Sequence, residues 1–256
     1  SLNLIGWTLV QKIMKRSTML RHVDLCSGIG GFSLGFEWAQ LSTPILFCDT
    51  EPWCRKILAK NFPNVPIATD VKELANDPER LVPDCDILTA GYPCQPFSVA
   101  GKQKGTEDDR HIWPFIFRIV AQKRPTWCVF ENVHGHIALG LDQVLLDLEA
   151  EGYSTRTFIV PACSVDAPHK RDRIWIIAKN VADTNSTRRE EQRWPQPAQP
   201  EHQAPQCGGG WLTEPAVGRV ANGIPKRVDR LKGLGNAIVP QIAQRIGETI
   251  KRADLQ

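Results

Sequence analysis

From residue 20 onward the chain alternates between short apolar runs and longer amphipathic runs, and this alternation limits its possible folds more than any other feature. The expected strands are residues 20–27, 44–49, 85–91, 126–132, 153–162 and 172–178, and the expected helices are residues 32–40, 51–62, 111–123 and 141–152. Apolar runs with few polar interruptions are typical of strands covered on both faces. The repetition predicts an α/β fold, a mainly parallel sheet flanked by helices. The 256 residues are enough to bury a sizeable core.

The regular pattern is interrupted between residues 179 and 230, where proline, glutamine, glycine and charged residues predominate. Such composition is typical of a loop-rich small lobe or of a partly disordered segment. Order returns near the end of the chain, where Pro240 opens an amphipathic helix. The apolar face of that helix is expected to hold Val239, Ile242, Ala243, Ile246 and Ile250. We therefore expect three parts, residues 1–178, 179–230 and 231–256, with the last packed back on the first.

Charge and cysteine content indicate which partners and which cellular location the chain could have. The formal net charge of +3 permits an anionic partner without requiring one. The eight cysteines are scattered and lack C-x-x-C spacing, so no metal site and no disulfide framework is expected, and a reducing, cytoplasmic location is favoured. Residues 1–18 carry their basic residues after the apolar part, and the apolar part is too short to cross a bilayer. We expect an amphipathic helix there and no membrane contact.

A glycine-rich loop, DLCSGIGGF (residues 24–32), joins the first strand to the first helix. Glycines at such a junction allow a sharp turn and a close approach of the backbone to a ligand. The dinucleotide pattern G-x-G-x-x-G fails because Ser33 stands at its third glycine, and no Walker lysine follows. By itself, the loop indicates either a general cofactor site or a plain tight turn.

Acidic residues follow the next expected strand. Asp49 lies about 20 residues after the glycine loop, where a carboxylate can accept hydrogen bonds from both hydroxyls of a ribose. Glu51, two residues later, is a competing candidate for that role. Asp49 could equally cap the helix that follows, and capping is the commoner role for an isolated residue such as Asp70.

The stretch AGYPCQPFS (residues 90–98) places Cys94 between two prolines, directly after an expected strand. A thiol with an ordinary pKa is only a few per cent thiolate at neutral pH, so a reactive cysteine needs a fixed position and a positive or dipolar surrounding. Pro93 and Pro96 restrict the backbone on both sides of Cys94. We interpret Cys94 as a nucleophile, although buried cysteines more often serve as small apolar residues.

Two further stretches carry charge at strand ends. Glu131, in FENV, ends an expected strand, which is where enzymes of this architecture place their chemistry. In HKRDRIWIIA, His169, Arg171 and Arg173 alternate, so an extended chain would point all three toward one face. Such a face suits an anion or a carboxylate partner, but each stretch taken alone could also be a solvated surface.

Taken together in their order, these motifs resemble those of the DNA cytosine-5 methyltransferases. DLCSGIGGF is similar to the family's S-adenosylmethionine loop, GYPCQPFS to its Pro-Cys-Gln motif and FENV to its Glu-Asn-Val motif. HKRDRIWIIA is similar to its Gln-x-Arg-x-Arg strand and GLGNAIVP to its closing Gly-Asn-x-x-x-Pro motif. The resemblance covers residues 20–178 and 231–251, and it implies the methyltransferase variant of the Rossmann-like fold.

The resemblance also implies roles for individual residues. Cys94 would add to carbon 6 of cytosine, Glu131 would protonate or hydrogen-bond N3, and Arg173 with Arg171 would hold Glu131 and the base oxygen. S-adenosyl-L-methionine would be the cofactor, with Phe32 stacking on adenine, Asp49 on the ribose and Asp70 on the adenine amino group. The implied cofactor contacts are Asp24, Ser27, Gly28, Gly30, Gly31, Phe32, Asp49, Glu51, Asp70, Val71, Gly91, Pro93 and Asn236.

Double-stranded DNA is the partner that the resemblance implies, with the target cytosine flipped out of the helix. Residues 99–113 are expected to close over the flipped base. The expected DNA contacts are Gln95, Ser98, His169, Arg188, Arg189, Arg193, Arg219 and Arg227. The chain departs from the family at His169, where glutamine is usual, and in its recognition region, which has only about fifty residues. We therefore expect a short or relaxed target sequence.

Three other functions remain open at this stage. An RNA (tRNA) cytosine-5 methyltransferase of the same fold would carry the same motifs. A catalytically silent DNA-binding homologue would keep the fold but not need Cys94, Glu131 and Arg173. A cysteine hydrolase would pair Cys94 with His134, His136 or His169 but leaves the glycine loop unexplained. We expect a monomer, with a restriction endonuclease as a possible partner of the system.

Overall fold

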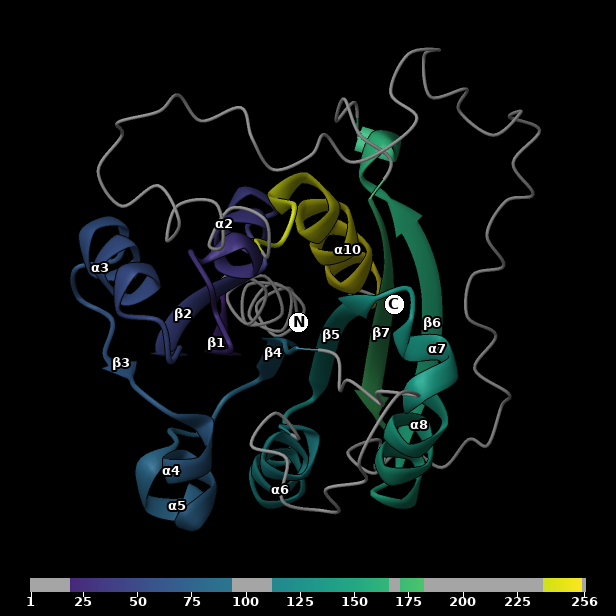
Figure 1. Cartoon of the computed structure of the whole chain (residues 1–256), viewed down its shortest axis with the longest axis horizontal. Helices are drawn as coiled ribbons and strands as arrows, with labels where there is room; N and C mark the ends of the chain where they lie inside the picture. Colours follow the sequence, from purple (N-terminus) through teal and green to yellow (C-terminus); the bar gives the residue numbers. More distant parts are fainter. Residues whose placement is uncertain (1–18, 94–111, 166–170, 182–236, 255–256) are drawn as a thin grey trace, which may run out of the picture.

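The computed structural model describes residues 19–93, 112–165, 171–181 and 237–254. Its centre is a seven-stranded sheet in the order β3-β2-β1-β4-β5-β7-β6 (Figure 1). The strands are β1 (Leu20–Leu25), β2 (Ser42–Cys48), β3 (Ile67–Ala68), β4 (Ile87–Gly91), β5 (Trp127–Val133), β6 (Tyr153–Pro161) and β7 (Asp172–Asn180). The strands β1 to β5 are parallel, β7 is antiparallel to β5, and β6 is antiparallel to β7.

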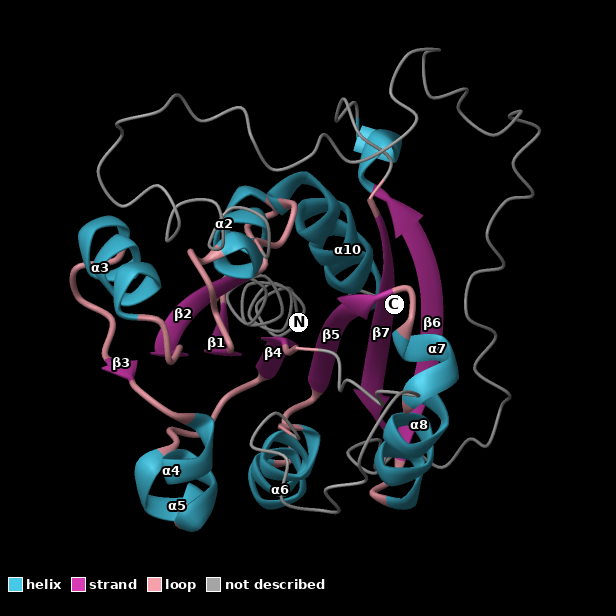
Figure 2. Ribbon diagram, viewed as in Figure 1, coloured by secondary structure: helices cyan, strands magenta, loops and turns pink. Residues whose placement is uncertain are grey.

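Helices cover both faces of this sheet (Figures 1 and 2). On one face lie α2 (Gly31–Trp38), α3 (Pro52–Asn61) and α10 (Pro240–Ala253). On the other face lie α4 (Val71–Asn76), α5 (Pro78–Leu81), α6 (Trp113–Lys123) and α8 (Leu141–Ala150). Two short elements complete the described fold, α7 (His136–Leu139) after β5 and the 3₁₀ turn η1 (Ala162–Val165) after β6.

The two covered faces correspond to two apolar clusters, because successive strand residues point to opposite sides of the sheet. In β5, Trp127 and Val129 belong to the cluster under α2 and α10, whereas Cys128 and Phe130 belong to the cluster under α6 and α8. All four side chains are buried. The near-continuous apolar run of β5 therefore reflects an inner strand covered on both sides, whereas the edge strand β6 exposes Phe158 and Ile159.

Close contact between α2 and α10 fixes the end of the chain on the sheet. A Cβ atom at Gly35 would lie 2.3 Å from the Pro240 carbonyl oxygen, and one at Gly31 would lie 2.6 Å from the Ile238 carbonyl oxygen. Glycine at these two positions allows the backbones to approach more closely than any side chain would permit. The apolar face of α10 buries Ile242, Ala243 and Ile250, as the sequence predicts.

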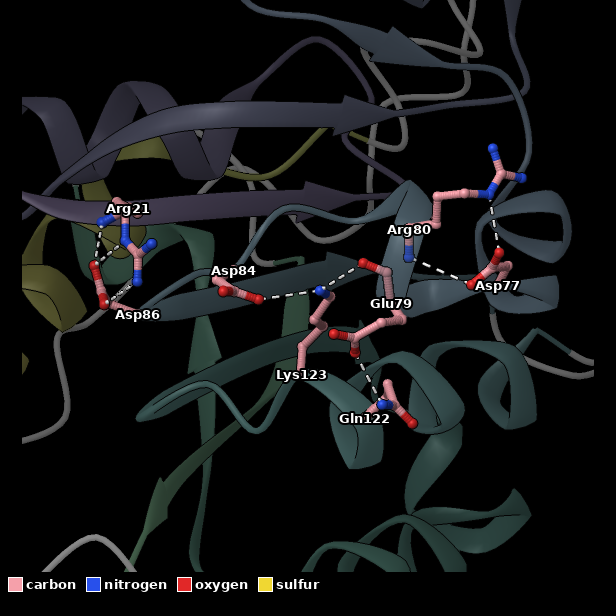
Figure 3. A network of polar contacts seen from close by, with 8 residues as sticks. All are labelled: Arg21, Asp77, Glu79, Arg80, Asp84, Asp86, Gln122 and Lys123. Atoms are coloured by element: carbon pink, nitrogen blue, oxygen red, sulfur yellow. Dashed lines mark hydrogen bonds and ion pairs between the residues drawn. The ribbon is translucent and has the colours of Figure 1, made fainter.

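Ion pairs and hydrogen bonds cluster around the beginnings of β1 and β4 (Figure 3). Arg21 pairs with Asp86 at 3.1 Å, and Lys123 pairs with Asp84 at 3.0 Å. The Arg21–Asp86 pair is open to solvent, where such pairs contribute about 0–1 kcal/mol. The Lys123 side chain is buried and also donates to the Glu79 carbonyl oxygen. This end of the sheet is therefore occupied by mutual pairing.

All ten expected strands and helices before the interruption are present, and five of the seven strands are parallel, which confirms a mainly parallel α/β fold. The sequence did not predict β3, α4, α5, α7 or η1, which are too short to show a period. Within the described residues, no helix combines the length and apolar character that crossing a bilayer requires.

Candidate active site

The predicted site residues gather where the parallel strands end. The carboxyl ends of β1, β2, β4 and β5 lie at one edge of the sheet, and β7 begins there because it is antiparallel to β5. Ligand sites of open α/β sheets form at this edge. The glycine loop, Asp49, Gly91, Glu131 and Arg173 are thereby brought to one end of the molecule from segments far apart in sequence.

The glycine loop turns sharply between β1 and α2. Gly28 and Gly30 have φ of +55° and +88°, a left-handed conformation that favours glycine. The free space beside the backbone varies along the loop. A Cβ atom at Gly28 would meet nothing within 4 Å, whereas one at Gly30 would lie 2.9 Å from the Phe62 ring. The Ser27 hydroxyl donates to the Asp24 carbonyl oxygen and accepts the Cys48 N–H at 3.1 Å, which fixes the loop to both strands.

Asp49 connects the end of β2 to this loop. Its Oδ2 accepts the Gly28 N–H at 2.7 Å and its Oδ1 accepts the Glu51 N–H at 2.8 Å. Burial raises the pKa of Asp49, and the two backbone donors oppose that effect. Each carboxylate oxygen can accept a further hydrogen bond. Glu51 is the N-cap residue of α3, so Asp49 does not occupy the capping position of that helix.

Asp70 caps a helix, the alternative role considered from the sequence. Its carboxylate accepts the Lys72 N–H at 2.9 Å at the start of α4, and Val71 is buried beside it. Burial raises the pKa of the Cys26 and Cys48 thiols, and the nearby Asp70 carboxylate adds to both rises. The capping bond leaves the second carboxylate oxygen of Asp70 uninvolved in the cap.

Two predicted cofactor residues lie behind the loop. Asp24 is fully buried and accepts hydrogen bonds from Thr89 and Ser33. Phe32 is 1 % exposed, and its ring packs against Phe36 and edge-on against Trp175. The structure therefore does not support Phe32 as an adenine-stacking residue, because neither face of its ring is open. Helical periodicity placed it correctly on α2 but could not show which face of the helix is buried.

Glu131 lies at the same edge of the sheet, on β5. It is 8 % exposed, and its Oε1 lies 3.1 Å from Nε of Arg173, near the start of β7. Burial raises the pKa of Glu131 to about 7, although the positive charges of Arg173 and Arg171 oppose the rise. A carboxyl group with such a pKa can carry a proton near neutrality and release it, which suits general acid–base chemistry.

The backbone at Arg171 is not extended, in contrast to the extended chain that the sequence predicts there. Its φ is +31°, so the chain is not extended before β7 begins, and the predicted alternation fails at this residue. Its Nη2 donates to the Ala237 carbonyl oxygen at 3.0 Å. Ile238, which follows Ala237, fills the space beside Gly91. A Cβ atom added at Gly91 would lie 3.1 Å from Ile238 Cδ1 and 3.8 Å from Glu131 Oε2.

Several residues of this region were missed from the sequence. Tyr92 lies between the end of β4 and Pro93, and its hydroxyl lies 3.1 Å from Nε2 of His136. Ile238 belongs to the GLGNAIVP motif, which could have indicated it. The buried residues His22 and Thr89 gave a weaker signal, as isolated polar residues within apolar strands.

Many expected site residues lie outside the described residues. These are Cys94, Gln95, Ser98, His169, Arg188, Arg189, Arg193, Arg219, Arg227 and Asn236. Residues 99–111 of the expected closing segment, residues 99–113, also lie outside them. Among the described residues, no group of three or more His, Cys, Asp or Glu side chains could hold a metal ion.

Comparison with curated sequences finds similar proteins among type II methyltransferases. The chain is 34% identical over 176 residues to the type II methyltransferase M2.BsuMI of Bacillus subtilis, covering 64% of this chain and 43% of that protein. It is 34% identical over 168 residues to M.HhaI of Haemophilus parahaemolyticus, covering 64% of this chain and 50% of that protein. The chain thus spans about half the length of these relatives.

Solved structures agree on the fold. The Dnmt2 methyltransferase of S. pombe superimposes with a TM-score of 0.56 at 23% identity, covering 68% of this chain and 58% of that one. A putative DNA modification methyltransferase from an E. coli prophage gives a TM-score of 0.51 at 23% identity, covering 64% and 47%.

One protein family matches most of the chain. Its description is "C-5 cytosine-specific DNA methylase", and the match extends over residues 20–213, from β1 into the segment after β7. The matched range contains the glycine loop, Asp49, Gly91, Glu131 and Arg173. The chain therefore belongs to the C-5 cytosine-specific DNA methylase family.

Proposed function

We propose that this protein is a DNA (cytosine-5)-methyltransferase that transfers a methyl group from S-adenosyl-L-methionine to carbon 5 of a cytosine flipped out of duplex DNA. The observation that carries this proposal is Glu131, a buried carboxyl group held by Arg173 one strand away from the segment that leads to Cys94. Membership of the family supports the reaction class.

Cys94 is the proposed nucleophile. Carbon 5 of cytosine is a weak nucleophile, and addition of a thiolate to carbon 6 breaks the aromatic system and makes carbon 5 enamine-like. Cys94 follows the end of β4 by three residues in the sequence, and β4 itself ends at the edge where β5 presents Glu131. Loss of the proton from carbon 5 later expels the Cys94 sulfur and restores the aromatic ring.

Glu131 is the proposed acid for this addition. The cytosine ring gains negative charge as sulfur adds to carbon 6, and a proton placed at N3 neutralises it. Because the pKa of Glu131 is raised to about 7 by burial, a substantial fraction carries that proton near neutral pH. Arg173 orients the carboxyl group through its Nε, and Arg171 adds positive charge to the same site.

The residues at the carboxyl ends of β1 and β2 fit S-adenosylmethionine, which supplies an electrophilic methyl group when bound. The open space at Gly28 allows a ligand to approach the backbone, and Asp49 has further acceptor capacity beside it for hydroxyl groups. The acidic residues Asp49, Glu51 and Asp70 suit a sulfonium cation and an amino group. Phe32 is assigned to the support of the loop rather than to adenine.

DNA contact is proposed for residues outside the described part of the chain. Gln95 and Ser98 flank the nucleophile, His169 precedes β7, and the arginines of residues 179–230 would meet phosphates or guanine edges. In this scheme residues 1–178 bind the cofactor and carry the chemistry, residues 179–230 read the target, and residues 231–256 brace the site. A monomer, alone or with a restriction endonuclease in the same system, is sufficient for this scheme.

A reducing, cytoplasmic location is proposed as well. Five of the six described cysteines, Cys26, Cys48, Cys54, Cys85 and Cys128, are free thiols, whereas Cys163 is disulfide-bonded. The proposal therefore rests on the five free thiols, and the disulfide at Cys163 departs from the sequence-based expectation.

Methyl transfer with tritiated cofactor tests the proposed function directly. Duplex DNA and tRNA should be offered separately to the wild-type chain, to Cys94→Ala and to Glu131→Gln. We expect label in DNA with wild type only, and bisulfite sequencing of the product should show a short or relaxed target. Label in tRNA alone would replace the DNA assignment by the RNA one, and label with Cys94→Ala at the wild-type rate would refute the mechanism.

A further inference from the structure

Beneath the glycine loop, four buried polar side chains form a closed ring. His22 Nε2 lies 2.8 Å from Thr89 Oγ1, which lies 2.8 Å from Asp24 Oδ1. Asp24 Oδ2 lies 3.0 Å from Ser33 Oγ, which lies 3.3 Å from His22 Nδ1. All four residues are 0 % exposed. The ring joins β1, β4 and α2 at the point where the loop leaves β1.

Counting hydrogens shows what this ring requires. Four contacts need four hydrogens, and the hydroxyls of Ser33 and Thr89 supply two of them. A carboxylate and a neutral imidazole together supply only one more, so one contact would bring two lone pairs together without a proton. Two protons shared between Asp24 and His22 complete the ring, either as a carboxylic acid beside a neutral imidazole or as a carboxylate beside an imidazolium.

We propose that this His22–Thr89–Asp24–Ser33 ring holds one proton more than a carboxylate and a neutral imidazole, and that the protonated ring positions the cofactor loop against the strand that leads to Cys94. The second half rests on the proposed function. Asp24 is central to it, because its side chain binds Thr89 of β4 and Ser33 of α2 while its carbonyl oxygen binds the Ser27 hydroxyl in the loop.

Burial favours the uncharged arrangement, a protonated Asp24 beside a neutral His22. Burial raises the pKa of Asp24 to about 7 and lowers the pKa of His22 to about 3. The groups that act on Asp24 from its surroundings are the Asp49 carboxylate, which raises its pKa, and the Ser33 backbone N–H on α2, which lowers it. On the other side, the His22 ring packs against Phe36 of α2.

The substitution Asp24→Asn tests the extra proton, because an amide offers the same donor and acceptor as a carboxylic acid without ionising. A buried acid with a raised pKa stabilises the fold most below its unfolded pKa, and that contribution is lost as pH rises to about 7. The unfolding constant of wild type relative to Asp24→Asn should therefore rise by up to about tenfold per pH unit between pH 5 and 7, and level off above. The contribution of His22 to the pH dependence of unfolding is common to wild type and Asp24→Asn, so it cancels in this ratio.

A flat ratio over this range would overturn the proposal. If Asp24→Asn does not fold, the wild-type chain still decides, through the ¹³Cγ shift of Asp24 and the ¹⁵N shifts of His22 at pH 6. A carboxylic acid signal, or two protonated imidazole nitrogens, supports the extra proton. An ionised Asp24 beside a neutral His22 contradicts it.

Binding of S-adenosylhomocysteine, measured by calorimetry, tests the positioning role. Thr89→Val removes one ring hydroxyl and should weaken binding roughly tenfold, whereas Thr89→Ser keeps that hydroxyl and should bind as wild type does. Ser42→Ala is the matched control, since the buried Ser42 hydroxyl has no partner among the described residues. Equal affinity for Thr89→Val and wild type would contradict positioning. If wild type itself does not bind, the cofactor assignment fails, while the proton test stands.

Discussion

Glu131 shows how one residue gains its chemistry from its position. It lies within a parallel strand, near the carboxyl end, and the neighbouring strand β7 runs in the opposite direction. Arg173 therefore reaches the carboxyl group from the beginning of its own strand. Burial and positive charge act in opposite directions on the pKa of Glu131, and burial prevails. The residue is poised near neutrality rather than fixed as a carboxylate.

Replacing Glu131 by glutamine should separate orientation from proton transfer. The amide retains the shape of the side chain and can still donate a hydrogen bond, but it cannot supply a proton. We expect kcat for methyl transfer to fall by roughly 10²–10⁴-fold, with little change in cofactor affinity. Steady-state kinetics with calorimetric binding checks this. A loss smaller than threefold in kcat would remove Glu131 from the chemistry.

The pH dependence of methyl transfer should report the same group. Glu131 acts in its protonated form, so its contribution is complete well below pH 7 and declines as pH rises through about 7. We expect kcat/KM to fall on the alkaline side with an apparent pKa near that value, while Glu131→Gln loses this limb. An alkaline limb of the same pKa in Glu131→Gln would assign it to another group.

Individual residues were predictable from the sequence to different degrees. Asp49 and Glu131 were identified because residues at strand ends meet at one edge of a parallel sheet. The adenine role of Phe32 was not supported, because burial of its ring depends on Trp175, which lies about 140 residues later in the chain. The ring around Asp24 could not be predicted, because Thr89 reaches it only through strand pairing.

At the scale of elements, the joint between α2 and α10 connects the last described segment to the cofactor loop. Gly31 and Gly35 of α2 face the segment from Ile238 to Ala243, and Gly247 of α10 faces Ala39 and Phe36. Glycines on both helices allow close backbone approach. This joint adjoins the glycine loop that precedes α2, and it includes Ile238, which lies beside Gly91.

Gly35→Ala tests this joint. The new Cβ would lie 2.3 Å from a backbone oxygen, so α10 must shift. We expect the free energy of unfolding to fall by about 2 kcal/mol or more in urea denaturation. Gly135→Ala is the control, because its Cβ would meet nothing within 4 Å, and it should change stability by less than about 0.5 kcal/mol. Equal stability of the two variants would show that the joint is loose.

Periodicity predicted the longer elements well but not how they pair. The expected strands and helices are present because each has a regular apolar face. The antiparallel direction of β7 was not predicted, since it is set by the β6–β7 hairpin and not by any local pattern. This direction brings Arg173 to Glu131, so this ion pair of the candidate site depends on long-range strand pairing.

For the whole molecule, the two ends of the sheet serve different purposes. At the beginnings of β1 and β4, charged groups pair with one another (Figure 3). At the carboxyl ends, Asp49 and Glu131 have raised pKa values and lie around the glycine loop and the segment leading to Cys94. Mutual charge pairing and the candidate chemistry therefore lie at opposite ends of one fold.

Covalent trapping on duplex DNA that contains 5-fluorocytosine tests the central claim most directly. Fluorine cannot leave carbon 5 as a cation, so an adduct through the Cys94 sulfur should persist once a methyl group has been transferred. With cofactor present, we expect wild type to form a complex that survives denaturing electrophoresis, and Cys94→Ser to form none. A stable complex with Cys94→Ser, or methyl transfer at the wild-type rate by Cys94→Ala, would contradict this account.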